Sequence, residues 1–435
     1  MANAADYRLM KVLQSRSFCR RCSALAWATL LAACLLSGRE MLAQSGGSVT
    51  STATTDRLKA PGWWPTKRDT ARGEYVGAAA CAECHDSEVS TASKSAMAHA
   101  ATRATEADSL ELVPLALQIG SYRYQISDSG GKKVLQISKG PASRSAPLLW
   151  AFGMGRIAQT YVYEQNGNFY ESHLSFYTSI QALDVTPGHP RTEPPSLAEG
   201  LGRRIPVEEK LRCFGCHTTA STAKGRLDTQ TLFPGVKCEA CHGPGSRHVA
   251  AMKSGDIDLG LSSIVNPAHL SASESVEFCG ACHRTWQDVV SDGPVRIGTL
   301  NVRFQPYRLE NSRCWKEGDA RITCMTCHDP HQPLVQDPAS YDAKCLQCHR
   351  AAGNSSANAA ATSEAKSTGK STETAAATTA GIKKSDSVED HRTACPIGVQ
   401  LCVTCHMPKF KNQIIHATFT DHWIRIAAPG APLPN

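Results

Sequence analysis

The chain has 435 residues, with 46 basic and 39 acidic side chains and 19 cysteines. The formal net charge of +7 is small for this length, so we expect no nucleic-acid partner. No run of 18 apolar residues follows the N-terminal segment, which excludes a polytopic membrane protein. Aromatic residues make up only 6% of the chain, so side chains alone would form a thin core.

The first 43 residues are typical of a secretory signal peptide. A basic region at 1–22 precedes an apolar run, Ala24–Leu36, and we place cleavage after Ala43. Two alternatives remain open: a lipoprotein signal that ends before Cys34 and puts a lipid anchor on it, or an uncleaved anchor. Each alternative predicts a periplasmic or otherwise extracytoplasmic protein that contacts the membrane only through a lipid or signal anchor.

Residues 44–75 are rich in Ser, Thr and Gly, which predicts a flexible linker. Beyond this linker, the motif Cys-x-x-Cys-His occurs seven times. It is the attachment signature of c-type haem, in which two thiols bond the vinyl groups and the histidine binds iron from the proximal side. The predicted attachment residues are Cys81, Cys84, Cys213, Cys216, Cys238, Cys241, Cys279, Cys282, Cys324, Cys327, Cys345, Cys348, Cys402 and Cys405. The predicted proximal ligands are His85, His217, His242, His283, His328, His349 and His406.

Zinc sites and redox dithiols also use Cys-x-x-Cys, but neither needs a histidine at the fifth position. Histidine occupies 16 of the 435 positions, so seven chance matches have a probability on the order of one in ten billion. The sequence therefore predicts seven covalent haem c groups. From residue 213 onward the motifs lie too close in sequence for separate domains, so these haems are expected to share one core and exchange electrons.

Histidines outside the motifs are candidates for the sixth coordination position of each iron. Six are predicted distal ligands: His248, His331, His416, His422, His189 and His99. His331 follows a proximal histidine by three residues, so we expect it to serve a neighbouring haem. Met97 is an alternative thioether ligand, and His173, His269 and His391 are expected not to bind iron. Six candidates for seven irons leave open whether one haem is five-coordinate.

Between about residues 115 and 180, the sequence pattern predicts strands rather than helices. Apolar and polar residues alternate there around a Ser-Gly-Gly turn at 129–131 and around Asn166-Gly167, which predicts two hairpins. We expect a small β-meander inserted after the first motif, serving as a spacer or as a docking face for a redox partner.

The rest of the chain predicts short helices and loops. Residues 351–388 have the composition of a disordered surface insert, and residues 428–435 form a tail. We therefore expect residues 76–427 to be one mainly α domain, in which short helices and loops wrap around a multihaem core. Cys314 and Cys395 lie outside every motif. We expect them to form a disulfide or, alternatively, to be two buried thiols.

The longer motifs resemble those of the cytochrome c-552/4 family of multihaem c-type cytochromes, over roughly residues 75–427. The residues that carry the resemblance are GMGRIAQTYVYEQNGNFYESHLSFY, TPGHP, CFGCHTT, CEACHGPGSRH, CMTCHDPHQ, CLQCH, CVTCHMPK and FTDHWIR. The resemblance implies an exported, mainly α-helical electron carrier with stacked and perpendicular haem pairs. It also favours His248, His331 and the C-terminal histidines as distal ligands, but not His173 and His269. The best-known member has four haems, so its partner does not carry over.

Two functions follow from these patterns. The first is electron transfer between redox proteins through closely packed, mostly bis-histidine haems, with no separate catalytic residues. The second is reduction of a small nitrogen or sulfur species at one five-coordinate haem. No Cys-x-x-Cys-Lys motif, common at the catalytic haem of multihaem nitrite reductases, occurs in the chain, which favours the electron carrier.

Overall fold

The computed structural model describes residues 70–112, 114–291, 299–316, 318–319, 321–349, 395, 398–427 and 433–434. The chain divides into units of residues 1–51 and 52–435, and every described residue belongs to the second. The predicted signal peptide, Cys34, the insert at 351–388 and His391 lie outside the described residues, as do most of the linker and the tail. Within those described ranges, no helix has the length and apolar composition of a membrane span.

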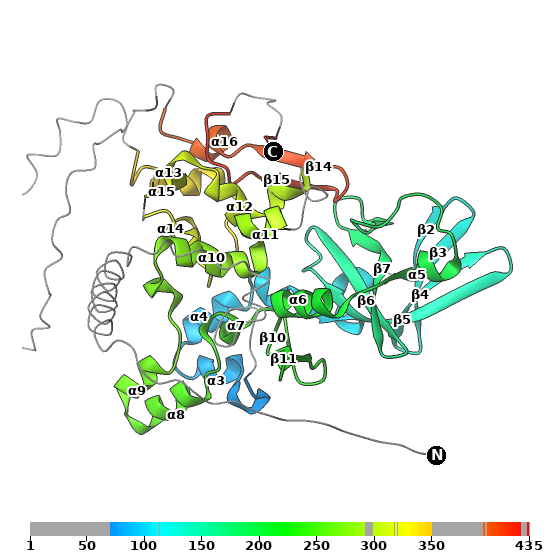
Figure 1. Ribbon diagram of the computed structural model, residues 1–435, viewed down its shortest axis with the longest axis horizontal. Coiled ribbons are helices and arrows are strands. Elements are labelled where there is room, and N and C mark those ends of the chain that lie inside the picture. The colour runs from blue at the N-terminus through cyan, green and yellow to red at the C-terminus, as the bar shows by residue number, and fades with distance from the viewer. Residues whose placement is uncertain are drawn as a thin grey trace, which may run out of the picture. The chain divides into compact units, whose positions relative to one another are not determined.

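A nine-stranded antiparallel sheet occupies the chain between residues 101 and 204 (Figure 1). Strands β2 to β8 pair in chain order, while β1 pairs with β5 and β9 with β7. The two ends of this path, β2 and β8, also contact each other, so the sheet curls strongly. Its strands are β1 (Ala101–Arg103), β2 (Leu115–Ile119), β3 (Tyr122–Ser129), β4 (Lys132–Lys139), β5 (Ala142–Phe152), β6 (Ala158–Gln165), β7 (Asn168–Tyr177), β8 (Ala182–Val185) and β9 (Gly202–Arg204).

Both predicted hairpins are present in this sheet. The β6–β7 turn has positive φ angles at Asn166 (53°) and Gly167 (74°), the backbone of a two-residue turn that matches strand twist. The β3–β4 turn likewise has positive φ at Gly130 (61°) and Gly131 (76°). Such angles suit glycine and asparagine, so the local sequence selects these turns.

The prediction of a mainly α fold with a small β-meander is wrong, because the sheet is the largest element of the described chain. The alternating pattern found the central hairpins but missed β8, just beyond the predicted range, and also β1 and β9, which join through pairing with β5 and β7. The predicted range contains all of β7, although its residues are buried on both faces from Ser172 onward and no longer alternate.

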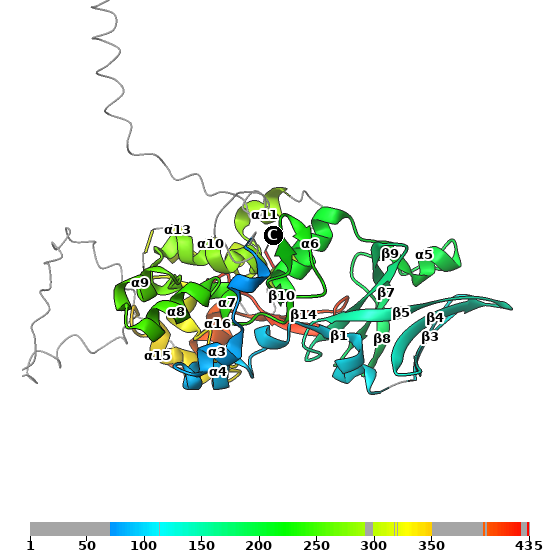
Figure 2. The same cartoon turned by 90° about the horizontal axis from the view of Figure 1, so that it is seen from below.

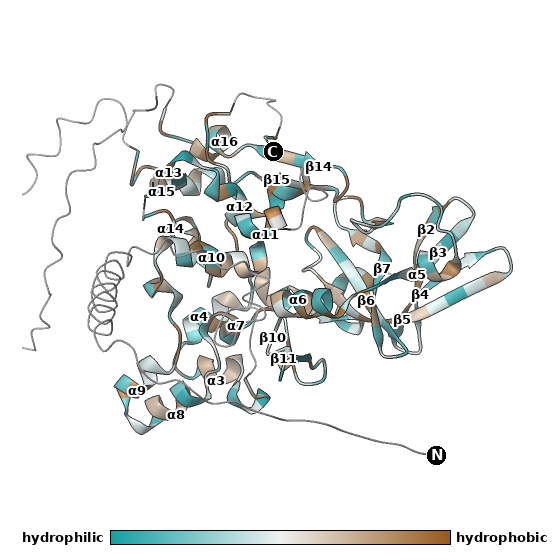
Figure 3. Cartoon of the chain, in the orientation of Figure 1, coloured by the Kyte–Doolittle hydropathy of each residue, from teal (hydrophilic) through white to brown (hydrophobic). Residues whose placement is uncertain are grey.

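The sheet encloses the largest hydrophobic core of the described residues. Alternate residues along neighbouring strands point inward, as with Tyr124 and Ile126 of β3 and Leu135 and Ile137 of β4, all of them fully buried. Figure 3 shows this alternation of hydrophobic and hydrophilic residues along the strands. Helix α5 (Leu197–Leu201) closes on this sheet near β9 (Figure 2). The sheet thus has an ordinary side-chain core.

The other helices are short and follow one another through the rest of the described chain. They are α3 (Ala78–Ala82), α4 (Asp86–Ala92), α6 (Val207–His217), α7 (Cys238–His242), α8 (Ser246–Ser254), α9 (Ile257–Ser262), α10 (Ala272–His283), α11 (Trp286–Ser291), α12 (Gln305–Glu310), α13 (Arg313–Lys316), α14 (Cys324–Cys327), α15 (Asp342–Cys345) and α16 (Cys402–His406). Single 3-10 turns are η1 (Arg72–Glu74), η2 (Met97–His99), η3 (Ala104–Glu106), η4 (Asp108–Leu110), η5 (Pro267–His269), η7 (Thr299–Arg303) and η8 (Pro338–Tyr341).

Three two-stranded ribbons lie among these helices. They pair β10 (Thr218–Thr219) with β13 (Phe233–Pro234), β11 (Thr222–Ala223) with β12 (Arg226–Leu227), and β14 (Lys409–Asn412) with β15 (Ala417–Thr420).

Helix α6 packs directly on the sheet. Its Phe214 is fully buried and meets Trp150, Phe152 and Phe169 edge to face, with ring centres 5.1 to 5.8 Å apart. Aromatic pairs in this geometry add to the stabilisation from buried area. Because α6 carries the second Cys-x-x-Cys-His motif, these contacts fix that motif against the sheet.

We predict that Leu135→Ala lowers the free energy of unfolding by about 2–5 kcal/mol, because it opens a cavity among fully buried side chains. The matched control is Leu112→Ala, since Leu112 is 51% exposed and its removal leaves no cavity. Urea unfolding followed by the strand circular dichroism signal measures both. Equal losses in the two variants would contradict this assignment of the core.

Candidate functional site

Each Cys-x-x-Cys-His motif folds as a single helical turn. The amides of His85, His328 and His349 donate to the carbonyl four residues back, at N–O distances of 2.9, 3.0 and 3.0 Å. A helical turn puts residues three apart on the same side. The paired thiols of a motif therefore face one way, as two bonds to one edge of a flat macrocycle require.

Thiols from different motifs lie beside one another. The hydrogen-bonded neighbours are Cys81 with Cys238, Cys216 with Cys282, Cys279 with Cys324, and Cys345 with Cys402. The bond between the first two raises the pKa of Cys81 and lowers that of Cys238 to about 7. Cys327 also lies close enough to Cys345 and Cys348 for their charges to raise its pKa, beyond the larger effect of burial. Motifs distant in sequence are thus adjacent in space.

Several motif histidines present only one ring nitrogen to a potential metal. The Nδ1 atoms of His217, His242 and His406 hydrogen-bond to backbone carbonyls, of Ala100 at 2.8 Å, Val265 at 2.8 Å and Arg425 at 3.0 Å. Metal-binding histidines usually donate their second N–H in this way, which fixes the ring and leaves Nε2 for the metal. Burial lowers the pKa of His217 and of His283, which favours the neutral, metal-binding form. His85 and His349 are exposed.

Two candidate distal histidines face proximal histidines. The ring centres of His242 and His331 are 5.9 Å apart, and those of His328 and His422 are 6.2 Å apart. Two imidazoles that bind one metal from opposite sides have ring centres about 6 Å apart, since each metal–nitrogen bond is about 2 Å. Nδ1 of His422 bonds to the Thr420 carbonyl at 3.1 Å, and burial lowers its pKa to about 4.

The other candidates divide into two groups. His248 bonds through Nδ1 to the Gly260 carbonyl at 2.9 Å, the same pattern as the motif histidines. The remaining three bond through Nε2 to oxygen atoms: His99 to the Ser93 carbonyl, His189 to Glu171 and His416 to Asp184, at 2.8, 3.1 and 2.6 Å. In these three the nitrogen that usually binds iron is already engaged.

The residues of the helical part fit covalent haem. Helices α3, α14, α15 and α16 carry motif cysteines and bury none of their residues. Helices this short are stable in water only when a face packs against apolar surface. Thiols, oriented imidazoles and uncovered helix faces together match a flat apolar macrocycle with an iron at its centre.

A buried ion pair holds the segment that carries His422. Arg308 of α12 donates to the Asp421 carboxylate through Nε at 2.7 Å and Nη2 at 2.9 Å, and both side chains are fully buried. Burial opposes ionisation of Asp421, but the bonds from Arg308, the Trp423 amide and Arg425 together outweigh it and hold the pKa of Asp421 below its usual value. Arg425 adds a further bond at 2.5 Å. Sequence reasoning missed this pair, because 113 residues separate its members.

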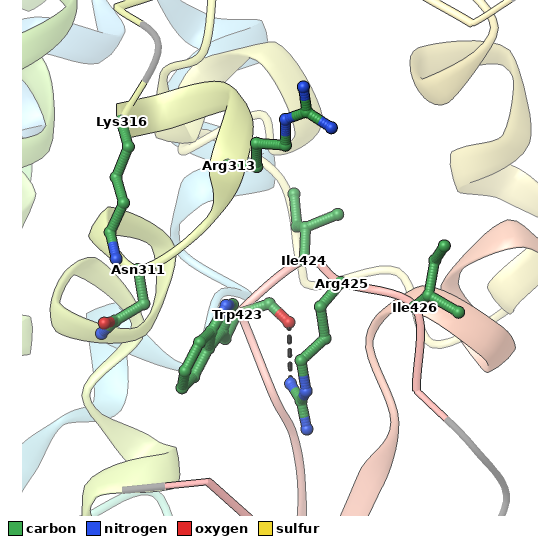
Figure 4. A pocket seen from close by; sticks show the side chains of 7 residues that line it. All are labelled: Asn311, Arg313, Lys316, Trp423, Ile424, Arg425 and Ile426. Carbon is green, nitrogen blue, oxygen red and sulfur yellow. Dashed lines mark hydrogen bonds between the residues drawn. The ribbon is translucent and has the colours of Figure 1, made fainter. Parts of the chain in front are cut away.

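A cavity of about 460 Å³ lies beside this segment. It is lined by Asn311, Arg313, Lys316, Trp423, Ile424, Arg425 and Ile426 (Figure 4). In this cavity, Nη1 of Arg425 donates a hydrogen bond to the Trp423 carbonyl at 2.9 Å. Arg425 also lies over the Trp423 ring, with its guanidinium carbon 5.4 Å from the ring centre.

The two cysteines outside the motifs are a separate matter. Cys314 lies near Cys348 of the sixth motif, and a disulfide between Cys314 and Cys395 stays a prediction.

Comparison with known proteins finds a family similarity over one segment of the chain. Residues 192–243, which include the second and third motifs, match the family model for cytochrome c554 and c-prime. The match spans 52 of the 435 residues, and over this segment the chain is similar to a family of haem-binding electron-transfer cytochromes. Its relation to the cytochrome c554 and c-prime family lies in the matched segment, which confirms the resemblance that the motifs indicated.

The solved structure of an outer cell wall cytochrome, OcwA, is similar at 19% identity and a TM-score of 0.29. The match covers 48% of this chain and 37% of that protein, so it spans little more than a third of the known structure. No curated protein sequence is significantly similar to this chain.

We predict that Asp421→Asn lowers the free energy of unfolding by about 3–5 kcal/mol, because it leaves the buried Arg308 without a counter-charge. The control is Asp319→Asn, which breaks a pair with Arg321, whose side chain is 59% exposed, and which should cost less than about 1 kcal/mol. Chemical denaturation followed by the Soret band measures both. A small loss in Asp421→Asn would show that this ion pair does not anchor the segment.

Proposed function

We propose that the chain is an exported cytochrome with seven covalent haem c groups, which passes electrons between redox partner proteins. The observation that carries the proposal is the continuous contact between neighbouring motifs. Bound haem supplies a one-electron carrier at each motif. The chain's own residues fix the spacing and orientation of these carriers.

The contacts link all the motifs into one connected series that branches at the fifth motif. Thiol neighbours join the first motif to the third, the second to the fourth, the fourth to the fifth and the sixth to the seventh. The fifth lies beside the sixth through Cys327, and beside the third through His331, which faces His242. The fifth motif therefore adjoins three others, and no motif is left outside the series. Such continuity supports a conductor of electrons more directly than it supports a single reaction centre.

The ring geometry supports particular distal ligands. We assign His331 to the iron held by His242, and His422 to the iron held by His328, because each pair has the separation of two imidazoles across one metal. His248 has the orienting bond of a ligand and remains a candidate. His99, His189 and His416 would have to exchange an existing hydrogen bond for a bond to iron.

The class of partner follows from the series of neighbouring motifs. A series of carriers needs a donor at one place and an acceptor at another, so we propose redox proteins for both roles. The basic and apolar N-terminal segment supports export, where covalent haem attachment takes place. A lipid or signal anchor would then be its link to the membrane.

The haem count is tested by the mass of the mature protein made in a host that attaches haem. We expect an addition of about 4.3 kDa, since seven haems weigh roughly 0.6 kDa each. The control is a Cys238→Ala, Cys241→Ala double variant, which should lose one haem. A mature protein with no added mass would end the proposal.

Ligand assignment is tested by His422→Ala. We expect the ferric protein to gain a high-spin electron paramagnetic resonance signal of about one iron in seven, because one iron loses its sixth ligand. His269→Ala is the control, since His269 is exposed and faces no proximal histidine by our assignment. An unchanged low-spin spectrum in His422→Ala would refute this ligand. A high-spin signal of that size in the unmodified protein would instead favour a reductase.

A further inference from the structure

Glu239 is a buried carboxylate inside the third motif, at a position that the haem signature leaves variable. The residue is 2% exposed. Its Oε1 accepts hydrogen bonds from the amides of Val76 at 2.9 Å and Gly245 at 2.8 Å, and its Oε2 accepts one from Gly77 at 2.8 Å. Backbone donors on both oxygens compensate for the loss of water around the negative charge.

These bonds join separate parts of the chain. Val76 and Gly77 immediately precede α3, which carries the first cysteine of the first motif, and they lie 163 and 162 residues from Glu239. Gly245 precedes α8, and a Cβ atom there would come within 3.1 Å of Val76 and 3.2 Å of Glu239. The glycine therefore permits the close approach. Through this one carboxylate, the first motif is held against the third, where Cys81 meets Cys238.

The charge of Glu239 also reaches both motifs. Glu239 adjoins Cys238 in the third motif and accepts bonds from the Val76 and Gly77 amides, which lie just before the first motif. The opposing charge nearby is Lys237, whose Nζ donates to the Ala98 carbonyl at 2.8 Å. Burial keeps solvent and salt from screening the carboxylate.

We infer that Glu239 is a positioning residue that locks the first motif to the third and lowers the reduction potentials of the two haems bound there. The inference rests on covalent haem at these motifs, as the proposed function has it. Reduction adds one negative charge to a haem, and a nearby buried carboxylate opposes that charge. The same side chain thus sets both the spacing of the pair and the ease of its reduction.

The charge is tested by Glu239→Gln, which keeps the size of the side chain. Spectroelectrochemical titration should show two haems whose ferrous-to-ferric ratio at a fixed potential rises about tenfold, a shift of about 59 mV. The matched control is Glu83→Gln in the first motif. Glu83 has a side chain 55% exposed and pairs with Lys253 at 2.7 Å, so its loss should change the ratio less than twofold.

The positioning role is tested by Glu239→Asp, which keeps the charge but is too short to reach every donor. Amide hydrogen exchange in the peptide 73–82 should become at least tenfold faster, while the potentials stay within a twofold change of the ratio. The unmodified protein is itself a test, because the Val76 and Gly77 amides should exchange slowly. Fast exchange there would overturn the positioning role even if no variant accumulates.

The outcomes separate this inference from the proposed function. Full haem mass with unchanged potentials in Glu239→Gln overturns the electrostatic role. Full haem mass with unchanged exchange in Glu239→Asp overturns the positioning role. Absence of haem from the unmodified protein overturns the proposed function instead.

Discussion

The helical part of this chain depends on how its motif helices are covered. Helices α3, α14, α15 and α16 bury none of their own residues, yet each holds motif cysteines at a defined place. Helices of this length do not persist in water without packing. Covalent haem, as proposed above, would supply that packing, because the macrocycle would be bonded to the same helical turn that it covers. Under this proposal, cofactor attachment and core formation are one event in this part of the chain.

The sheet is built on the opposite principle. Its strands fill their interior with large side chains such as Tyr124, Leu135 and Trp150, all fully buried. Helix α6 connects the two kinds of core, because Phe214 packs into the sheet while His217, three residues later, bonds to the Ala100 carbonyl beside β1. The sheet is thus tied directly to one Cys-x-x-Cys-His motif, which gives that motif a support independent of the other motifs.

Buried carboxylates organise the motifs and ligands that lie far apart in sequence. Asp421 binds Arg308 and so holds the segment of His422, while Glu239 binds amides before α3 and α8 and so holds the first motif to the third. Each carboxylate is stabilised by donors from other segments, so the cost of burying it is met only when those segments are in place. Electrostatics therefore makes the arrangement of motifs specific, whereas hydrophobic contact makes it stable.

The sequence alone determined what depends on near neighbours. The two thiols and the histidine of each motif lie within one helical turn, and Asn166-Gly167 prefers the φ angles of its turn whatever surrounds it. Tertiary structure decided the rest. The full sheet needed β1 and β9 to pair with distant strands, and the approach of His331 to His242 or of Glu239 to Val76 has no local signal. Local patterns fix the spacing of motif residues and the backbone angles of turns, but contacts between segments far apart in the sequence depend on the packing of the whole chain, which no short pattern encodes.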